Sequence, residues 1–161
     1  MNNFLKPFLI GLFFSLALTP VVRFIAARYR LLSQPTEDRW HRKPTAIFGG
    51  IAIFISFMVP LFIFTQNKDI VFWSIVLGGT MAFSSGLIDD IFHVAPYIKL
   101  MFQIIIACAM VLCGISFKSV YNPLISVPVT IFWFTAIMNA FNLLDNMDGL
   151  CAGIAAIASG S

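Results

Sequence analysis

The chain alternates between long apolar stretches and short polar connections. Five apolar stretches approach the length of a membrane-spanning helix: residues 8–22, 47–65, 70–88, 100–117 and 124–141. A sixth begins at Leu150. Since a hydrocarbon core about 30 Å thick takes roughly 20 apolar residues of helix, the pattern predicts an all-α fold. We expect a polytopic transmembrane helix bundle with five complete spans and the start of a sixth.

The composition excludes an ordinary soluble domain. Hydrophobic residues make up 60% of the chain, charged residues 11%, and the mean hydropathy is +0.93. Continuous apolar runs favour helices over a β-barrel, whose strands alternate apolar and polar residues. No repeat or low-complexity linker interrupts the chain, so residues 1–161 are expected to form a single membrane domain. Because the sixth stretch is cut off at Ser161, the chain is expected to be the N-terminal part of a longer protein.

Other readings of the apolar stretches are less favoured. The first stretch is interpreted as a signal anchor and not a cleaved signal peptide, because arginines and no small-residue cleavage site follow it. The three cysteines lie in apolar stretches without CxxC spacing, so neither a disulfide framework nor a zinc site is supported. His41 and His93 lack the spacing of metal-binding histidines on a helix.

Basic residues in short connections predict the orientation in the membrane. The connection after the first stretch carries Arg23, Arg28, Arg30, Arg39, Arg42 and Lys43. It is therefore expected on the cytoplasmic side of the plasma (inner) membrane, with the N-terminus outside. If the spans alternate, one cytoplasmic face also receives Asp89, Asp90, Asp145 and Asp148. Polar groups from separate segments would then meet at one face and form a site.

Asp89 and Asp90 predict a metal site. They are adjacent and follow an apolar stretch, where a helix is expected to end. Clustered carboxylates repel one another unless a cation lies among them or one of them binds a proton. Oxygen ligands suit Mg²⁺, which commonly bridges carboxylates and phosphates. The alternative is that both acids are simply solvated at the end of a span.

A second polar group, Asn139, Asn142, Asp145 and Asp148, has a spacing of three residues. Each such step rotates about 300 degrees on an α-helix, so the four side chains cannot form one stripe. We expect both asparagines on the last turns of the fifth helix, followed by a break. Asp148 would then cap the sixth helix, and as an isolated residue it is more often a cap than a catalytic group.

Lys43 and Lys99 are the candidate phosphate-binding residues. Lys43 precedes a glycine pair, Gly49 and Gly50, at the start of the second helix, where free backbone N–H groups favour anions. Lys99 follows Asp89 by ten residues in the same short connection. The alternatives are an ordinary cytoplasmic basic residue for Lys43 and a lysine anchored at the membrane surface for Lys99.

Three motifs in this order carry a resemblance: "HRKPTAIFGGIAIF", "GLIDD" followed by "PYIK", and "NAFNLLDNMDGLCAG". Together they resemble the polyprenyl-phosphate N-acetylhexosamine-1-phosphate transferase family, of the glycosyltransferase family 4 type, and its undecaprenyl-phosphate GlcNAc-1-phosphate transferase-like branch. The resemblance implies a Mg²⁺-dependent membrane enzyme. It would transfer an N-acetylhexosamine 1-phosphate from a UDP-sugar to undecaprenyl phosphate or another polyprenyl phosphate and release UMP, a first membrane step of cell-envelope polysaccharide synthesis.

The resemblance also implies roles for individual residues. The catalytic residues would be Asp89, Asp90, Asp145 and Asp148; the metal ligands would be Asn142, Asp90 and Asp89; the substrate-binding residues would be Lys43, Lys99 and Asn139. Asn146 stands where the family usually has Gly, and Asn tolerates the left-handed backbone of such a turn. Because the resemblance covers only the first half of the family's length, residues 1–161 alone are expected to be inactive.

Three alternatives stay open. One is an enzyme of the phospho-MurNAc-pentapeptide translocase branch. A cation or proton transporter would need carboxylates near the middle of the bilayer, and an inert membrane scaffold would need no site. The expected partners are a UDP-N-acetylhexosamine, a polyprenyl phosphate, membrane lipid and a second copy of the chain as a homodimer, with no nucleic acid.

Overall fold

The computed structural model describes residues 2–29, 32–33, 45–46, 49–92, 94–117, 122–144 and 150–160. This part of the chain contains six helices: α1 Asn2–Arg28, α2 Gly49–Phe64, α3 Ile70–Phe92, α4 Pro96–Leu112, α5 Pro123–Leu144 and α6 Leu150–Gly160. Two short strands, β1 Leu32–Ser33 and β2 Thr45–Ala46, pair antiparallel after α1. The helical prediction is confirmed, whereas the two strands were not predicted.

Three helices are long and apolar enough to cross a membrane by length and composition: Leu5–Arg28, Ile70–Phe92 and Pro123–Leu144. The other two predicted spans are also apolar helices, but α2 has 16 residues and α4 has 17. The prediction of five complete spans is therefore confirmed for three of them. Many large apolar side chains on these helices are exposed, as lipid-facing surfaces require.

Side-chain caps and proline fix the beginnings of α3, α4 and α5. The Asp69 carboxylate accepts a hydrogen bond from the backbone N–H of Phe72 at 2.9 Å, which caps α3. The Asn122 side chain accepts one from the N–H of Leu124 at 3.0 Å and caps α5 in the same way. Pro96 occupies the first turn of α4, where its missing N–H costs no helical hydrogen bond.

A glycine ends α4 earlier than the hydropathy pattern predicted. Gly114 has a φ of 85°, a left-handed conformation that side chains with a Cβ rarely adopt. Its N–H donates to the carbonyl of Val111 at 2.9 Å, and the N–H of Ile115 donates to that of Met110 at 3.1 Å. This pair of bonds is a Schellman motif. The apolar residues up to Phe117 therefore belong to the following connection and not to the helix.

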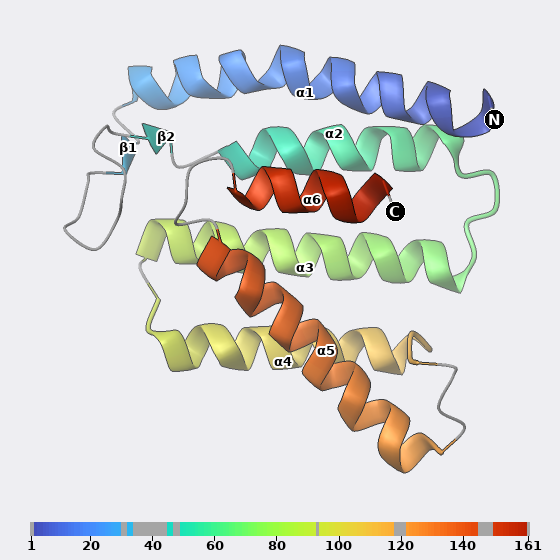
Figure 1. Cartoon of the computed structure of the whole chain (residues 1–161). Coiled ribbons are helices and arrows are strands. Elements are labelled where there is room, and N and C mark those ends of the chain that lie inside the picture. The colour runs from blue at the N-terminus through green and yellow to red at the C-terminus, as the bar shows by residue number, and fades with distance from the viewer. Residues whose placement is uncertain are drawn as a thin grey trace.

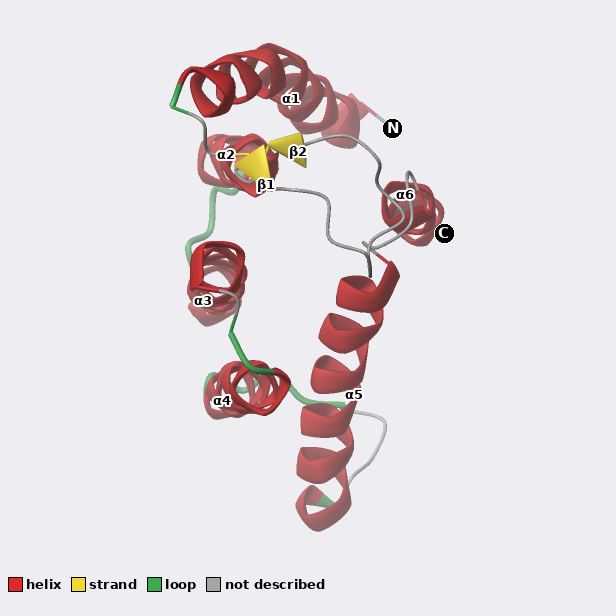
Figure 2. Cartoon of the chain, turned by 90° about the vertical axis from the view of Figure 1, so that its left-hand side faces the viewer, coloured by secondary structure: helices red, strands yellow, loops and turns green. Residues whose placement is uncertain are grey.

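The helices are arranged so that their polar ends meet. In Figure 1, α2, α3 and α4 lie roughly side by side, α1 runs along α2, and α5 crosses α4 obliquely. The ends of α1, α3 and α5 and the beginnings of α2, α4 and α6 all lie at the left of this view. Figure 2 looks onto that end of the bundle. The predicted convergence of these helix ends at one side is confirmed.

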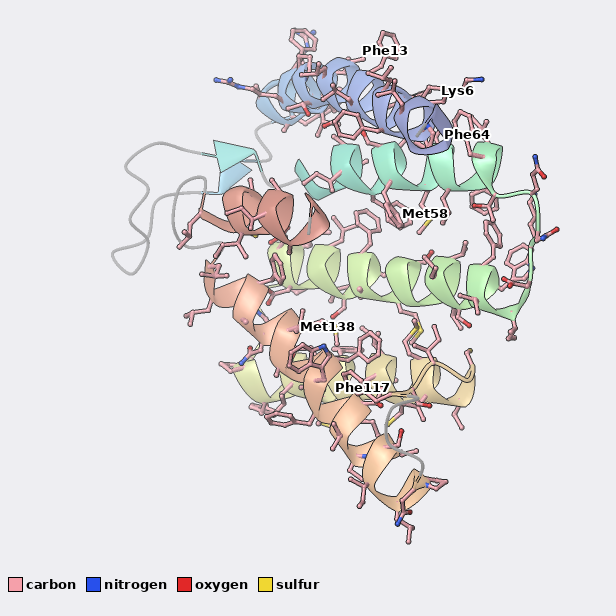
Figure 3. All side chains as sticks on the ribbon, turned by 45° about the vertical axis from the view of Figure 1, so that its right-hand side comes forward. Lys6, Phe13, Met58, Phe64, Phe117 and Met138 are labelled. Carbon is pink, nitrogen blue, oxygen red and sulfur yellow. The ribbon has the colours of Figure 1, made fainter. Side chains whose placement is uncertain are left out.

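Small and flexible side chains let neighbouring helices approach closely. A Cβ added to Gly11 of α1 would lie 3.2 Å from the carbonyl oxygen of Ser56 in α2. A Cβ on Gly78 of α3 would overlap the sulfur of Met110 in α4. Met58 of α2 lies between α2 and α3 (Figure 3) and is only 8% exposed. Without a strong hydrophobic force between helices in lipid, such close packing is a main source of their association.

Candidate functional site

A cavity of about 310 Å³ lies between α3, α4 and α5. It is called the polar pocket below. Its lining residues come from α3 (Ala82, Ser85, Gly86, Asp89), α4 (Lys99, Gln103, Ile106) and α5 (Ile137, Met138, Phe141, Asn142). In Figure 3, Met138 is labelled on the part of α5 just above the point where α5 crosses α4. The size is at the lower end of the range for small-molecule sites.

An ion pair between Asp89 and Lys99 is the charged centre of the polar pocket. The Lys99 Nζ lies 2.6 Å from the Asp89 Oδ2, and both side chains are 23% exposed. Asp89 is in the last turn of α3 and Lys99 in the first turn of α4, so the chain reversal between the two helices brings them together. Each charge offsets the cost of partly burying the other. The remaining ammonium hydrogens and carboxylate lone pairs can bind a ligand.

Asp89 and Asp90 do not share one direction. α3 continues to Phe92, two residues beyond the pair, so the expectation that the helix ends at the carboxylates was wrong by half a turn. Neighbouring side chains on a helix diverge by about 100 degrees. Accordingly Asp89 lines the polar pocket, whereas Asp90 is exposed and is not one of the lining residues.

The two predicted asparagines lie on α5 but line different cavities. Asn142, in the last turn, lines the polar pocket with Asp89 and Lys99. Asn139 lines a second cavity of about 490 Å³, together with Leu100 of α4 and residues of α5. The structure therefore brings together three predicted site residues from three helices and places Asn139 outside that group.

Three further predicted residues, Lys43, Asp145 and Asp148, lie outside the described residues. The end of α5 and the beginning of α6, which flank residues 145–149, lie at the same end of the bundle as the end of α3 and the beginning of α4 (Figure 1). The roles of these three residues stay predictions.

The oxygen atoms that line the polar pocket are suitable Mg²⁺ ligands, but they are too few to fill its coordination sphere. Within the described ranges, no group of three His, Cys, Asp or Glu residues is placed to hold a metal ion. Asp89 and Asn142 supply oxygen ligands to the pocket. Mg²⁺ is typically held by one or two carboxylates together with water and substrate phosphates. The donor set thus fits a metal that is completed by phosphate.

The sequence analysis did not single out Gln103. It lines the polar pocket from α4 and is only 6% exposed. A polar side chain four residues after Lys99 shares its helix face. That spacing, within an otherwise apolar stretch, is the signal that could have identified it.

Comparison with known protein families identifies the family of this chain. The model of glycosyl transferase family 4 matches residues 72–161, more than half of the chain and every lining residue of the polar pocket. The chain belongs to glycosyl transferase family 4. The resemblance predicted from the three motifs is therefore confirmed.

Relatives of this family 4 chain are named as sugar-phosphate transferases. It is 28% identical over 98% of its length to the probable undecaprenyl-phosphate N-acetylglucosaminyl 1-phosphate transferase of Bacillus subtilis, covering 46% of that protein. It is 30% identical over 90% of its length to the undecaprenyl-phosphate alpha-N-acetylglucosaminyl 1-phosphate transferase of Thermotoga maritima, covering 47%.

A relative from the other branch is the phospho-N-acetylmuramoyl-pentapeptide-transferase of Chlorobium phaeobacteroides. The identity is 30% over 76% of the chain, covering 40% of that protein. The family 4 chain spans less than half the length of the relatives described here. No solved structure matches it significantly.

Proposed function

We propose that the full-length protein transfers an N-acetylhexosamine 1-phosphate from a UDP-sugar to undecaprenyl phosphate, or to a similar polyprenyl phosphate, and releases UMP. The reaction would be a first membrane step of cell-envelope polysaccharide synthesis. The names of the relatives support the acceptor and the transferred group. The observation that carries the proposal is the Asp89–Lys99 pair, held with Asn142 in one pocket at the converging helix ends.

The chemistry joins two anionic reactants. An oxygen of the acceptor phosphate attacks the phosphorus that bears the sugar; a new P–O bond forms, and the P–O bond to UMP breaks. Lys99 lowers the repulsion between the two phosphate groups and stabilises the developing charge. Asp89 orients the acceptor and accepts a hydrogen bond or proton from it. A covalent enzyme intermediate is unnecessary, because the lipid phosphate is itself a nucleophile.

Mg²⁺ is part of the proposal. Asp89 and Asn142 would hold it in the polar pocket. Asp90 does not line this pocket, and its role as a metal ligand stays a prediction from the sequence. When bound, the metal would supply positive charge that offsets the phosphate oxygens. The segment with Asp145 and Asp148 is predicted to act at the same site.

The proposed site faces the cytoplasm. Arg23 and Arg28, in the last turns of α1, lie at the helix ends that converge near the polar pocket (Figure 1), whereas Lys68 lies in the connection between α2 and α3 at the other end. This distribution supports a multi-pass plasma-membrane protein with its N-terminus outside. Within this proposal α2 and α4 also cross the membrane, which gives five spans in one domain. A homodimer stays a prediction.

Labelling with a membrane-impermeant maleimide tests this orientation. In full-length protein whose native cysteines are replaced by alanine, Asn67→Cys should react in intact cells, because the α2–α3 connection is outside. Tyr97→Cys, exposed at the start of α4, should react only after the cells are permeabilised. Equal labelling of both positions in intact cells contradicts the orientation.

An assay with defined substrates tests the function. Membranes with the full-length protein should convert UDP-N-acetylglucosamine and undecaprenyl phosphate to a lipid-linked sugar diphosphate and UMP in equal amounts. Chelation of divalent cations should stop both products, and added Mg²⁺ should restore them. Membranes that bind both substrates but form neither product would overturn the proposal.

The second candidate is transfer from a UDP-MurNAc-pentapeptide, favoured by the named relative of Chlorobium phaeobacteroides. Supplying that donor in the same assay separates the two reactions. A cation or proton transporter is less well supported, because Asp89 and Lys99 lie in terminal turns of their helices and pair with each other. Proton flux without lipid-linked product would favour the transporter.

A further inference from the structure

Gln103 is a buried polar residue whose carbonyl group lacks a partner. Its side chain is 6% exposed, and its Oε1 has no hydrogen-bond partner among the residues that the structure describes. Buried polar groups in native proteins are nearly always hydrogen-bonded, because an unpaired one costs free energy. An acceptor left open inside a pocket therefore indicates a donor supplied from outside the described residues.

Gln103 lies deeper in the bundle than the ion pair. It follows Lys99 by one helical turn on the same face of α4, and α4 begins at the end of the bundle where the helix ends converge. Four residues of helix correspond to roughly 6 Å along its axis. The charged part of the polar pocket is thus at its outer end, and the Gln103 amide is farther inside.

The inner part of the polar pocket is apolar apart from a few neutral groups. Ile106 follows Gln103 on α4, and Ile137 and Met138 face it from α5. Bringing an ionised phosphate into such surroundings costs much more than bringing in a neutral group. An open carbonyl oxygen also requires a hydrogen donor, which a fully ionised phosphate lacks, and in the proposed reaction any proton of the acceptor phosphate goes to Asp89 at the outer end of the pocket. Both arguments favour a neutral partner for Gln103.

We propose that Gln103 is a specificity-determining residue that hydrogen-bonds a neutral hydroxyl or amide N–H of the sugar nucleotide. This inference rests on the proposed function. Of the two reactants, polyprenyl phosphate has only an apolar tail besides its phosphate group, whereas the sugar nucleotide carries neutral hydroxyl and amide donors. Lys99 would bind the phosphates and Asp89 would orient the acceptor, while Gln103 recognises the uncharged part of the donor substrate.

The test compares Gln103→Met with wild type in the full-length protein. Methionine is unbranched and fills a similar volume, but it has no hydrogen-bond donor and only a weak acceptor. A residue needed only for packing would be replaced without effect. We expect the KM for UDP-N-acetylglucosamine to rise about tenfold, as expected for loss of one buried hydrogen bond. The KM for undecaprenyl phosphate should stay within about twofold. Gln66→Met, in the exposed α2–α3 connection, is the matched control and should change neither KM.

Inhibition by UMP distinguishes two sources of the hydrogen donor. UMP contains the nucleoside but not the sugar. If Gln103 contacts the nucleoside, Gln103→Met weakens inhibition by UMP about tenfold as well. If it contacts the sugar, inhibition by UMP is unchanged while the KM for the sugar nucleotide still rises. Both results support the inference.

Other results overturn it. Unchanged KM values in an active Gln103→Met enzyme would mean that a water molecule alone satisfies the amide, and the proposed function would stand. A rise confined to the KM for undecaprenyl phosphate would assign Gln103 to the acceptor. Thermal stabilisation by UDP-N-acetylglucosamine gives a readout without turnover. A wild-type protein that UDP-N-acetylglucosamine neither stabilises nor turns into product overturns both proposals. If the wild type is stabilised but inactive, and Gln103→Met needs about tenfold more UDP-N-acetylglucosamine for the same stabilisation, this inference is supported and only the proposed function is overturned.

Discussion

Replacing Asp89 with asparagine should lower the turnover of sugar 1-phosphate transfer by about 10²- to 10⁴-fold, the usual range for loss of a group that handles a proton. Asparagine has nearly the same shape, so the fold and the approach of α3 to α4 should persist. It has no negative charge, however, and cannot accept a proton from the acceptor phosphate or hold a metal ion strongly. The measurement is kcat in membranes with equal amounts of variant and wild-type full-length protein.

The matched control is Asp69→Asn, at the opposite end of α3. Asp69 caps that helix through the Phe72 N–H, and asparagine is an equally good cap. This variant should retain wild-type turnover. An Asp89→Asn enzyme that retains more than about one tenth of wild-type turnover would exclude Asp89 from proton transfer and metal binding.

Replacing Lys99 with methionine should lower turnover by about 10²- to 10³-fold, similar to the loss of one preorganised donor to a developing negative charge. The Lys99 Nζ contacts Asp89 at 2.6 Å in the polar pocket, so its removal takes away the described cation closest to the proposed phosphates. Methionine retains most of the unbranched stem that packs between the helices. Turnover at saturating concentrations of both substrates is the quantity to measure.

Two controls separate a role in catalysis from a role in holding the helices together. Lys68→Met removes a lysine near the rings of Phe62 and Phe72, far along the chain from the polar pocket, and should keep wild-type turnover. The double variant Asp89→Lys, Lys99→Asp restores an ion pair with the charges exchanged. It should recover thermal stability but remain inactive, because the cation and the carboxylate have changed places. Recovery of turnover in the exchanged pair would reduce Lys99 and Asp89 to a structural role.

The length of the apolar stretches and the residues that begin and end helices determined much of this fold. Apolar stretches near the thickness of a bilayer must form helices, since backbone groups in lipid can only be satisfied within the segment. The beginning of α6 at Leu150 was predicted correctly, and so was the meeting of the helix ends that carry Asp89, Lys99 and Asn142. α4 ends at Leu112 because Gly114 terminates the helix. A glycine after an apolar stretch is a known helix stop signal, but the hydropathy pattern alone does not include it.

The sequence also determined which charged and polar side chains lie near the converging ends of the helices. Which of these side chains contact one another was decided only by the tertiary structure. Spacing along the chain gives a residue's angle on its own helix, whereas the rotation and crossing of neighbouring helices depend on how their side chains interlock. Only this packing decided that Asp89 meets Lys99 while Asp90 faces elsewhere, and that Asn142 and Asn139 line different cavities. The same packing buries the Gln103 amide with an open acceptor, a feature that belongs to three helices together and not to any one segment.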